Sequence, residues 1–312
     1  MNELDFEPEK MGPPEEPPAS VTDLFDPAAA LIAMAMAAAT AAIASLATAR
    51  SSGQRANRFA QVGCLLGVGG GFALGCWWLE IWPSWPPAHD RGWFLLVLWP
   101  AVVLVEAVNA ILSRPRWLGW LLRAGIAASA GPVLLYVSSW STWQTALILG
   151  GLTLGLLVEW FLLTKLVERT SSPAIPVSLT VTALCVGVPM MIGSYFTGGM
   201  LGLPLAGTLA GVALATALAP IRVAKSWIGP GTVGLFALVV MGHFSGTLPA
   251  TWAIILFASP VLGWMGELPW FRDLQAWQRE LLRFCFALTP IGAAAWLLTF
   301  AVRLPSLPQS LP

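Results

Sequence analysis

The stretch LVLWPAVVLVEAVNAILSRPR (residues 96–116) is apolar almost throughout until Glu106 and Asn109, and it closes with two arginines. A helix needs roughly 20 apolar residues to cross the hydrocarbon core of a bilayer, and this stretch with the apolar residues before it is long enough. A carboxyl group inside such a span is costly unless it binds a proton or meets a cation. The stretch therefore predicts a membrane-spanning helix in which Glu106 has a specific reason to be present.

The whole chain shares the composition of this stretch. Of its 312 residues, 57% are hydrophobic and 10% are charged, whereas about a quarter of an average soluble domain is charged. We therefore predict an all-α, polytopic integral membrane helical bundle with about ten transmembrane helices, or nine if the alanine-rich first run does not span. The apolar runs cover residues 28–49, 59–79, 93–112, 117–137, 145–167, 174–193, 199–218, 231–247, 250–268 and 281–302.

The basic residues divide the two ends of these helices. Lys and Arg accumulate in the short cytoplasmic loops of membrane proteins. When the ten runs are followed along the chain, 13 of the 16 basic residues fall on one face, and we expect that face to be cytoplasmic. The 13 are Arg50, Arg55, Arg58, Arg114, Arg116, Arg123, Lys165, Arg169, Arg222, Lys225, Arg272, Arg279 and Arg283. We accordingly expect the chain in a bacterial cytoplasmic (inner) membrane with both termini non-cytoplasmic.

The ends of the chain differ in composition from the apolar part. Half of the 16 acidic residues and five prolines lie before residue 27. Such a segment has too little apolar surface to fold, so we expect residues 1–26 to be a disordered acidic, proline-rich tail. The remaining predicted units are one transmembrane helical domain over residues 27–303 and a short C-terminal tail over residues 304–312.

Two further carboxyl groups fall inside predicted spans, in the same inner half as Glu106. They are Glu159 and Glu267. A cation is near the first of the three, because Arg123 begins the next span and a tight hairpin would bring it to Glu106. We expect Glu106 to face inward, toward Arg123 and Glu159. Three interpretations stay open: a satisfied buried pair that fixes helix register, a proton or substrate site, or a glutamate that only reaches the lipid headgroups, which suits Glu267 best. The candidates for binding or proton and ion coupling are Glu106, Asn109, Arg123, Glu159 and Glu267.

Small residues recur at four-residue spacing in several of the predicted helices. This spacing places them on one helix face, where they allow a second helix to approach closely. The candidate packing residues are Gly63, Gly67, Gly71 and Gly75 in one helix, and Gly151 and Gly155 on the stripe that continues to Glu159. Gly207, Gly211, Ala215 and Ala219 form a similar stripe.

Two predicted hairpins resemble each other, which suggests an internal parallel repeat. Each has a mid-span proline, an inner glutamate and an arginine that closes an LLR triplet. The first carries Trp93, Pro100, Glu106, Trp120, Arg123 and Pro132, and the second carries Trp252, Pro260, Glu267, Trp277, Arg283 and Pro290. Repeats with broken helices around a polar centre are typical of transporters.

Several kinds of site are disfavoured. Only two histidines are present, and both are predicted on the outer side, so paired haem ligation is not expected. The four cysteines stand singly and are interpreted as small core residues, not as metal ligands or disulfides. The glycine-rich segment GCLLGVGGGFALG (residues 63–75) follows no strand, which excludes a dinucleotide-binding loop. We expect no metal and no cofactor. A membrane-embedded enzyme is the least favoured function, because the chain shows no paired-carboxylate metal site and no Ser/His dyad.

Two functions fit these features. The first is a transporter or flippase for a small hydrophobic or amphiphilic molecule, with Glu106 and Glu159 as proton or cation carriers. The alternative is a non-catalytic membrane scaffold or an assembly subunit of a larger membrane complex, favoured by the glycine stripes and by the lack of chemistry. The expected partner is the lipid bilayer, with another membrane protein or a second copy of the chain as further candidates and no nucleic acid.

Overall fold

In the computed structural model, the described residues are 26–49, 54–87, 89–112, 116–135, 142–170, 172–193, 195–219, 225–271 and 274–292. Every regular element in them is helical. The long helices are α2 (Pro27–Ala49), α3 (Gln54–Trp78), α5 (Trp99–Ile111), α6 (Arg116–Leu134), α7 (Thr142–Arg169), α8 (Ala174–Ile192), α10 (Gly202–Leu218), α11 (Ile228–Phe244), α12 (Ala250–Ala258) and α13 (Ala276–Ala287). Shorter elements are α4 (Asp90–Trp93), α9 (Phe196–Gly199), a π-helix η1 (Phe94–Leu98) and the 3-10 helices η2 (Ser259–Glu267) and η3 (Pro269–Phe271).

Seven helical segments within the described residues are long and apolar enough to cross a membrane, which is compatible with a multi-pass membrane protein. The alanine-rich first run is among them, but the predicted count of ten is not confirmed. The other three predicted spans are helical in a shorter or more polar form. Helix α6 has 19 residues but contains Arg123, α11 has 17 residues, and α13 has 12. The last predicted span runs beyond residue 292, and both predicted tails lie outside the described residues, apart from Asp26.

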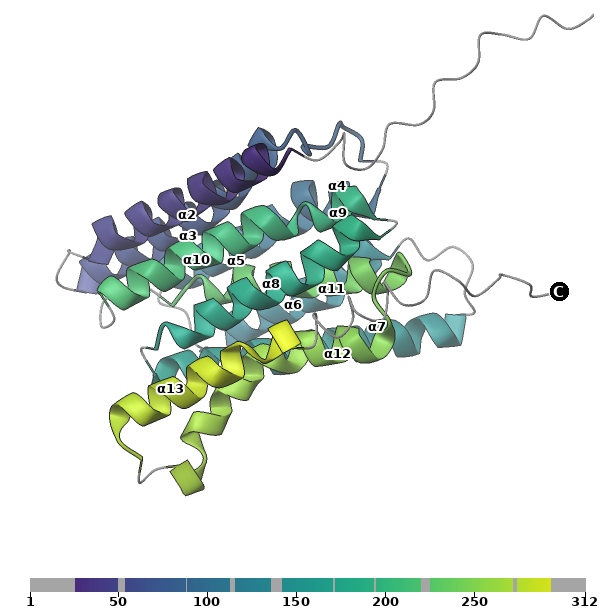
Figure 1. Ribbon diagram of the computed structural model, residues 1–312. Helices are drawn as coiled ribbons and strands as arrows, with labels where there is room; N and C mark the ends of the chain where they lie inside the picture. Colours follow the sequence, from purple (N-terminus) through teal and green to yellow (C-terminus); the bar gives the residue numbers. More distant parts are fainter. Residues whose placement is uncertain are drawn as a thin grey trace, which may run out of the picture.

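The helices form one bundle with two distinct sides (Figure 1). Helices α2 and α3 lie at one side, α12 and α13 lie at the other, and α8 and α10 run between them. The interior is built from apolar side chains of the middle helices, and Leu179, Leu209, Leu235 and Trp160 are each fully buried or nearly so. Helix α11 is buried along almost its whole length, so the bundle is organised around it.

Close backbone packing joins α2 to its neighbours through glycine. A Cβ atom added at Gly71 would lie 2.8 Å from the Ala37 carbonyl oxygen, and one at Gly211 would lie 2.2 Å from the Ala38 carbonyl oxygen. Only glycine fits at such contacts, because any larger residue would push the helices apart. The stripes on α3 and α10 thus lie where the four-residue spacing predicts, against neighbouring faces of one alanine-rich helix.

The stripe on α7 differs from this pattern. A Cβ atom at Gly151 or Gly155 would have no neighbour within 4 Å. The expectation that these two glycines let another helix pack closely is therefore wrong for the described part of the chain, because α12 stands off from α7 along this face and leaves a groove. The cysteines also divide: Cys64 and Cys76 are buried, Cys185 is half-buried, and Cys285 is exposed and so is not a core residue.

Candidate functional site

The predicted meeting of Glu106 and Arg123 is present. The arginine Nε donates to Oε1 of Glu106 over 2.7 Å, and an arginine Nη donates to Oε2 over 2.9 Å. The two side chains come from α5 and α6, consecutive helices that pack against each other. Two parallel hydrogen bonds between a guanidinium and a carboxylate are the strongest geometry for such a pair. The Glu106 side chain is 4% exposed and the Arg123 side chain 17% exposed, so the pair is sheltered from water.

Aromatic rings hold the guanidinium in place. The Arg123 Cζ lies 4.9 Å from the ring centre of Trp120 and 5.4 Å from that of Trp160. Contact between a cation and an aromatic face is favourable, and more so where water is excluded. Helix α11 also covers the pair, because a Cβ atom at Gly229 would lie 2.7 Å from both the Glu106 Cγ and the Trp160 ring. The site is thus assembled from four helices, α5, α6, α7 and α11.

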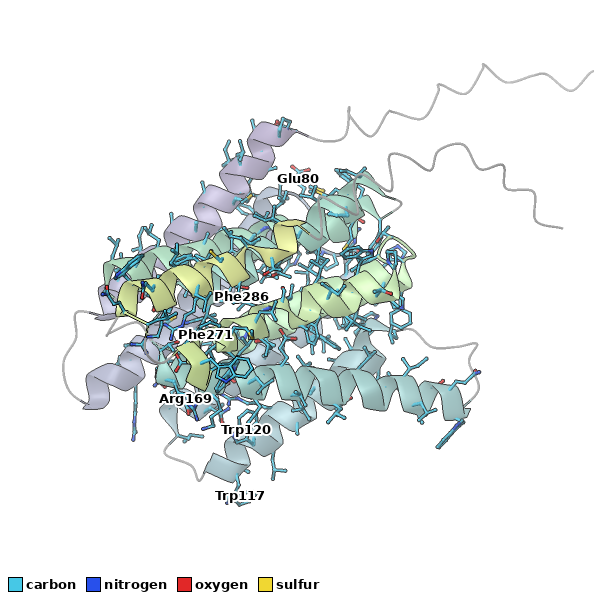
Figure 2. The ribbon with its side chains drawn as sticks, turned by 60° about the horizontal axis from the view of Figure 1, so that its bottom comes forward. Glu80, Trp117, Trp120, Arg169, Phe271 and Phe286 are labelled. Atoms are coloured by element: carbon cyan, nitrogen blue, oxygen red, sulfur yellow. The ribbon has the colours of Figure 1, made fainter. Side chains whose placement is uncertain are left out.

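A cavity of about 350 Å³ opens beside this pair. Its walls come from the first turns of α6 and α11, the last turns of α5 and α7, and α3 near Gln61. Hydrogen bonds close to it join the same ends, since the Ser226 hydroxyl donates to the Gln61 carbonyl over 2.8 Å and Arg58 donates to the Ile111 carbonyl over 3.3 Å. These contacts bring together several helix ends that the sequence assigns to one basic face. Figure 2 shows Trp117 and Trp120 far from Glu80, which follows the opposite end of α3.

The charges around this cavity are mixed, with one more cation than anions. The charged residues lining it are Glu106, Arg123, Lys165, Glu168 and Lys225. Lys165 pairs with Glu168 over 2.8 Å at the surface, and Arg123 pairs with Glu106. Within the described part of the chain, Lys225 makes no ion pair. The cavity therefore suits a small anionic or zwitterionic group better than a cation.

The five predicted site residues divide among three places. Asn109 lies in the cavity with Glu106 and Arg123, and its buried Nδ2 has no hydrogen-bond partner among the described residues. Glu159 does not join them. It lines an apolar groove formed with α12 and η2, although the next residue, Trp160, contacts Arg123. The expectation that Glu159 faces Glu106 and Arg123 is therefore wrong. The side chains of Glu159 and Trp160 project from different sides of α7, and it is Trp160 that contacts Arg123.

Glu267 belongs to a second ion-pair cluster. Its carboxylate accepts a hydrogen bond from Arg283, and Arg283 also donates to Glu280. Glu280 in turn accepts a hydrogen bond of 2.6 Å from the Ser172 hydroxyl, which ties α13 to the start of α8. Glu267 is paired and partly buried, which argues against a residue that only reaches the lipid headgroups.

Several residues of the site carry no strong signal in the sequence. Lys165, Glu168 and Lys225 are ordinary near the ends of membrane helices, and only the fold brings them to one cavity. The basic count predicts that they share a face, but not that they share a site.

At the far end, the Tyr195 hydroxyl donates to Asp90 over 2.5 Å, and burial, together with this hydrogen bond, raises the pKa of the Tyr195 phenol. Tyr195 therefore remains a neutral donor that ties the α8–α9 turn to α4.

No protein-family model, no curated protein and no solved structure matches this chain.

Proposed function

We propose that this chain is a transporter or flippase for a small amphiphilic molecule with an anionic head. The observation that carries the proposal is the position of Trp120. This side chain lines the polar cavity beside Glu106 and Arg123, and it also lines an apolar groove of about 740 Å³ between α6 and α7. A polar site that meets an apolar groove open to the side suits a molecule with a charged head and a hydrocarbon tail.

The groove between α6 and α7 supplies the apolar half of such a site. It is lined by Trp117, Leu121, Leu157, Val158 and Phe161, and several of these side chains are strongly exposed, as expected where lipid covers them. The head of an amphiphile would lie toward Lys165 and Lys225, while its tail would lie along this groove. The volume of each cavity falls in the usual range for small-molecule sites, about 300–1,000 Å³.

The ion pair provides a means of coupling. An anionic head that enters the cavity competes with Glu106 for the donors of Arg123. If Glu106 binds a proton, its carboxyl group holds the guanidinium less strongly, and Arg123 can turn toward the head. Proton relays that use intramembrane carboxyl groups are common in transporters. In this proposal the basic end faces the cytoplasm of a bacterial cell, and both termini lie on the other side of the inner membrane.

A specific observation also favours the second candidate function, a membrane scaffold or assembly subunit. Arg123 donates a hydrogen bond to each carboxylate oxygen of Glu106, and two tryptophan rings contact its guanidinium. A pair with a purely structural role requires such contacts. Close packing of α2 against α3 and α10 through glycine serves the same end. In this role the pair would fix helix register and no molecule would pass.

Flux in reconstituted vesicles separates the two functions. The probes are a nitrobenzoxadiazole-labelled phosphatidylglycerol, which is anionic, and the matching phosphatidylcholine, followed by chemical bleaching of the outer leaflet. We expect the protein to accelerate transbilayer movement of the anionic probe more than that of the zwitterionic one. Lys225→Ala should lower the anionic rate specifically, because it removes the cavity cation that forms no ion pair among the described residues.

The matched control is Arg169→Ala, which removes a cation from the end of α7 that lies nearest the cavity. Arg169 lies over the ring of Trp264 and does not line the cavity. The transport proposal fails if wild-type protein moves both probes no faster than protein-free vesicles, and that result supports the scaffold function. Equal loss in Lys225→Ala and Arg169→Ala would show that total charge matters and that the cavity does not.

A further inference from the structure

A second apolar groove runs along the other side of α7, between this helix and α12 with η2. Two adjoining cavities, of about 710 and 570 Å³, share Gly151, Gly155, Phe257 and Ala258, so they form one continuous groove. Its floor comes from α11, at Phe236 and neighbouring residues. We name this feature the α7–α12 groove.

Glycine makes the α7–α12 groove deep. Neither Gly151 nor Gly155 would meet an atom within 4 Å if it carried a Cβ, so the space over them is open, unlike the tight contacts of Gly71. Along α7 the groove extends from Leu147 to Leu162. At 1.5 Å per residue this is about 22 Å, longer than one leaflet of the hydrocarbon core, which is about 15 Å thick. The groove is therefore long enough for an extended lipid tail.

A single acidic group stands in this apolar surface. Glu159 is 3% exposed, and its two carboxyl oxygens are buried with no hydrogen-bond partner among the described residues. The nearby indole of Trp264 is occupied, because its Nε1 donates to the Leu162 carbonyl over 3.1 Å. A buried carboxyl group without a partner is costly, and such groups inside a membrane usually mark a functional site. The open groove gives a partner for Glu159 a place to lie.

We propose that the α7–α12 groove binds a neutral single-chain lipid that ends in a hydroxyl group. The hydroxyl hydrogen-bonds the Glu159 carboxyl, and the chain lies over Gly155 and Gly151 toward Leu147. Twelve residues separate Glu159 from Leu147, or about 18 Å of helix, so the polar end sits at Glu159 and the tail fills the rest. A neutral hydroxyl fits because a charged head would lose its hydration in this apolar groove, whose described lining contains no lysine or arginine to balance an anion.

This inference goes beyond the proposed function and does not depend on it. The site proposed for transport lies between α6 and α7 and at the end of α7 near Lys165, whereas the α7–α12 groove lies toward α12 and η2, and the two apolar grooves share only Val158 and Leu162 of α7. A scaffold could hold such a lipid as well as a transporter could. Labelling of Glu159 therefore reports on occupancy of the groove without any measurement of flux.

Carbodiimide labelling reports on access to Glu159. Dicyclohexylcarbodiimide is apolar and adds to protonated carboxyl groups in apolar places, where the product rearranges to a stable N-acylurea that mass spectrometry can locate. We expect labelling of full-length protein in detergent at Glu159, and its absence in Glu159→Gln. Hexadecanol should protect Glu159, whereas hexadecane, which has the same chain without the hydroxyl, should protect it less. One net hydrogen bond corresponds to a ratio of roughly two- to tenfold between the two.

Matched leucine variants test the groove itself. Gly155→Leu fills the groove beside Glu159 and should slow labelling, and it should abolish protection by hexadecanol. Gly150→Leu is the control, because Gly150 has the same open surroundings on the same helix but does not line the groove. Both variants should melt like the wild-type protein, since neither added side chain meets another atom within 4 Å of its Cβ.

Three results would each overturn the proposal. The first is a folded wild-type protein in which Glu159 is not labelled. The second is equal protection by hexadecanol and hexadecane, which would mean that any hydrocarbon enters and that Glu159 binds nothing. The third is equal labelling in Gly155→Leu and Gly150→Leu, which would mean that the reagent reaches Glu159 by another path.

Discussion

The two hairpins that resemble each other in sequence make the same kind of ion pair, but they bury opposite partners. In the α5–α6 hairpin Glu106 pairs with Arg123, 17 residues later, and in the η2–α13 hairpin Glu267 pairs with Arg283, 16 residues later. The Glu106 side chain is 4% exposed and that of Arg123 is 17% exposed. In the second pair Arg283 is 8% exposed and Glu267 is 22% exposed. The first hairpin thus buries its anion more deeply, and the second its cation.

In each hairpin, the more deeply buried member of the pair has its own set of contacts. Among the described residues, Glu106 pairs with one cation, Arg123, and the α11 backbone at Gly229 covers it closely. Arg283 has two carboxylates, Glu267 and Glu280, and a Cβ atom at Gly266 would lie 3.0 Å from its Cγ. Loss of Glu106 would therefore leave Arg123 without a carboxylate partner among the described residues, whereas loss of Glu267 would leave Arg283 paired with Glu280.

The helical irregularities of the two hairpins also correspond. The π-helix η1 precedes α5, which has Pro100 in its first turn, and α12 changes into the 3-10 helix η2, which has Pro260 in its first turn. A proline at the start of a helical segment needs no amide donor, so it favours a change of helix type there. These parallels are consistent with a repeated unit, which stays a prediction. The hairpins differ in which partner they bury, and we expect an energetic difference that four substitutions test.

The largest effect is expected in the first hairpin. Glu106→Gln leaves Arg123 without its counter-charge, and breaking a buried pair costs about 3–5 kcal/mol. The free energy of unfolding in a detergent titration measures this. Glu106→Gln combined with Arg123→Gln should recover part of the loss, because no uncompensated charge remains. If Glu106→Gln instead unfolds like wild type but loses pH-dependent flux, the residue acts as a proton carrier, and its role in stability is small.

Packing on the first pair gives the next effect. Gly229→Ala places a methyl group 2.7 Å from both Glu106 and Trp160, so the pair or α11 must move. Overpacking of this kind costs about 1–3 kcal/mol. Gly125→Ala is the control, because a Cβ atom there meets nothing within 4 Å. Equal stability of both variants would show that α11 does not hold Glu106 tightly, and the first hairpin would then resemble the second.

A smaller effect is expected in the second hairpin. Glu267→Gln removes one carboxylate, but Arg283 keeps Glu280, and Glu267 is partly solvated. The loss should be about 1 kcal/mol, nearer to that of an exposed pair than to that of a broken buried pair. The same detergent titration measures it beside Glu106→Gln. A loss as large as that of Glu106→Gln would remove the energetic difference between the hairpins.

The sequence predicts local relationships in this molecule better than distant ones. Glu106 meets Arg123 because a short connection forces two neighbouring helices to lie side by side, so depth and spacing are sufficient to predict the contact. Glu159 faces η2, which lies about a hundred residues further along the chain, and no local pattern specifies that contact. Ser259, where the α-helix changes to a 3-10 helix, makes another distant contact that no local pattern specifies, the hydrogen bond between its hydroxyl and that of Thr182.

The glycine stripes show why identical spacing can have different outcomes. Gly71 and Gly155 each belong to a four-residue stripe, yet the first touches a backbone and the second faces open space. Lipid tails are as apolar as side chains, so a membrane exerts little hydrophobic force that would close a groove. Spacing predicts that a second helix can approach, but contacts elsewhere decide whether it does.

The smallest effect concerns a third ion pair, which sets the baseline for the other two. Lys165 and Glu168 are 41% and 49% exposed and lie three residues apart on α7. An exposed pair at this spacing gains little, because water screens the charges and two flexible side chains must be ordered. Glu168→Gln should therefore change stability by less than about 0.5 kcal/mol, although both residues line the same cavity as Glu106. If the loss approaches that of Glu267→Gln, the cavity is drier than the exposure of its rim indicates, and burial alone no longer explains the difference between the two hairpins.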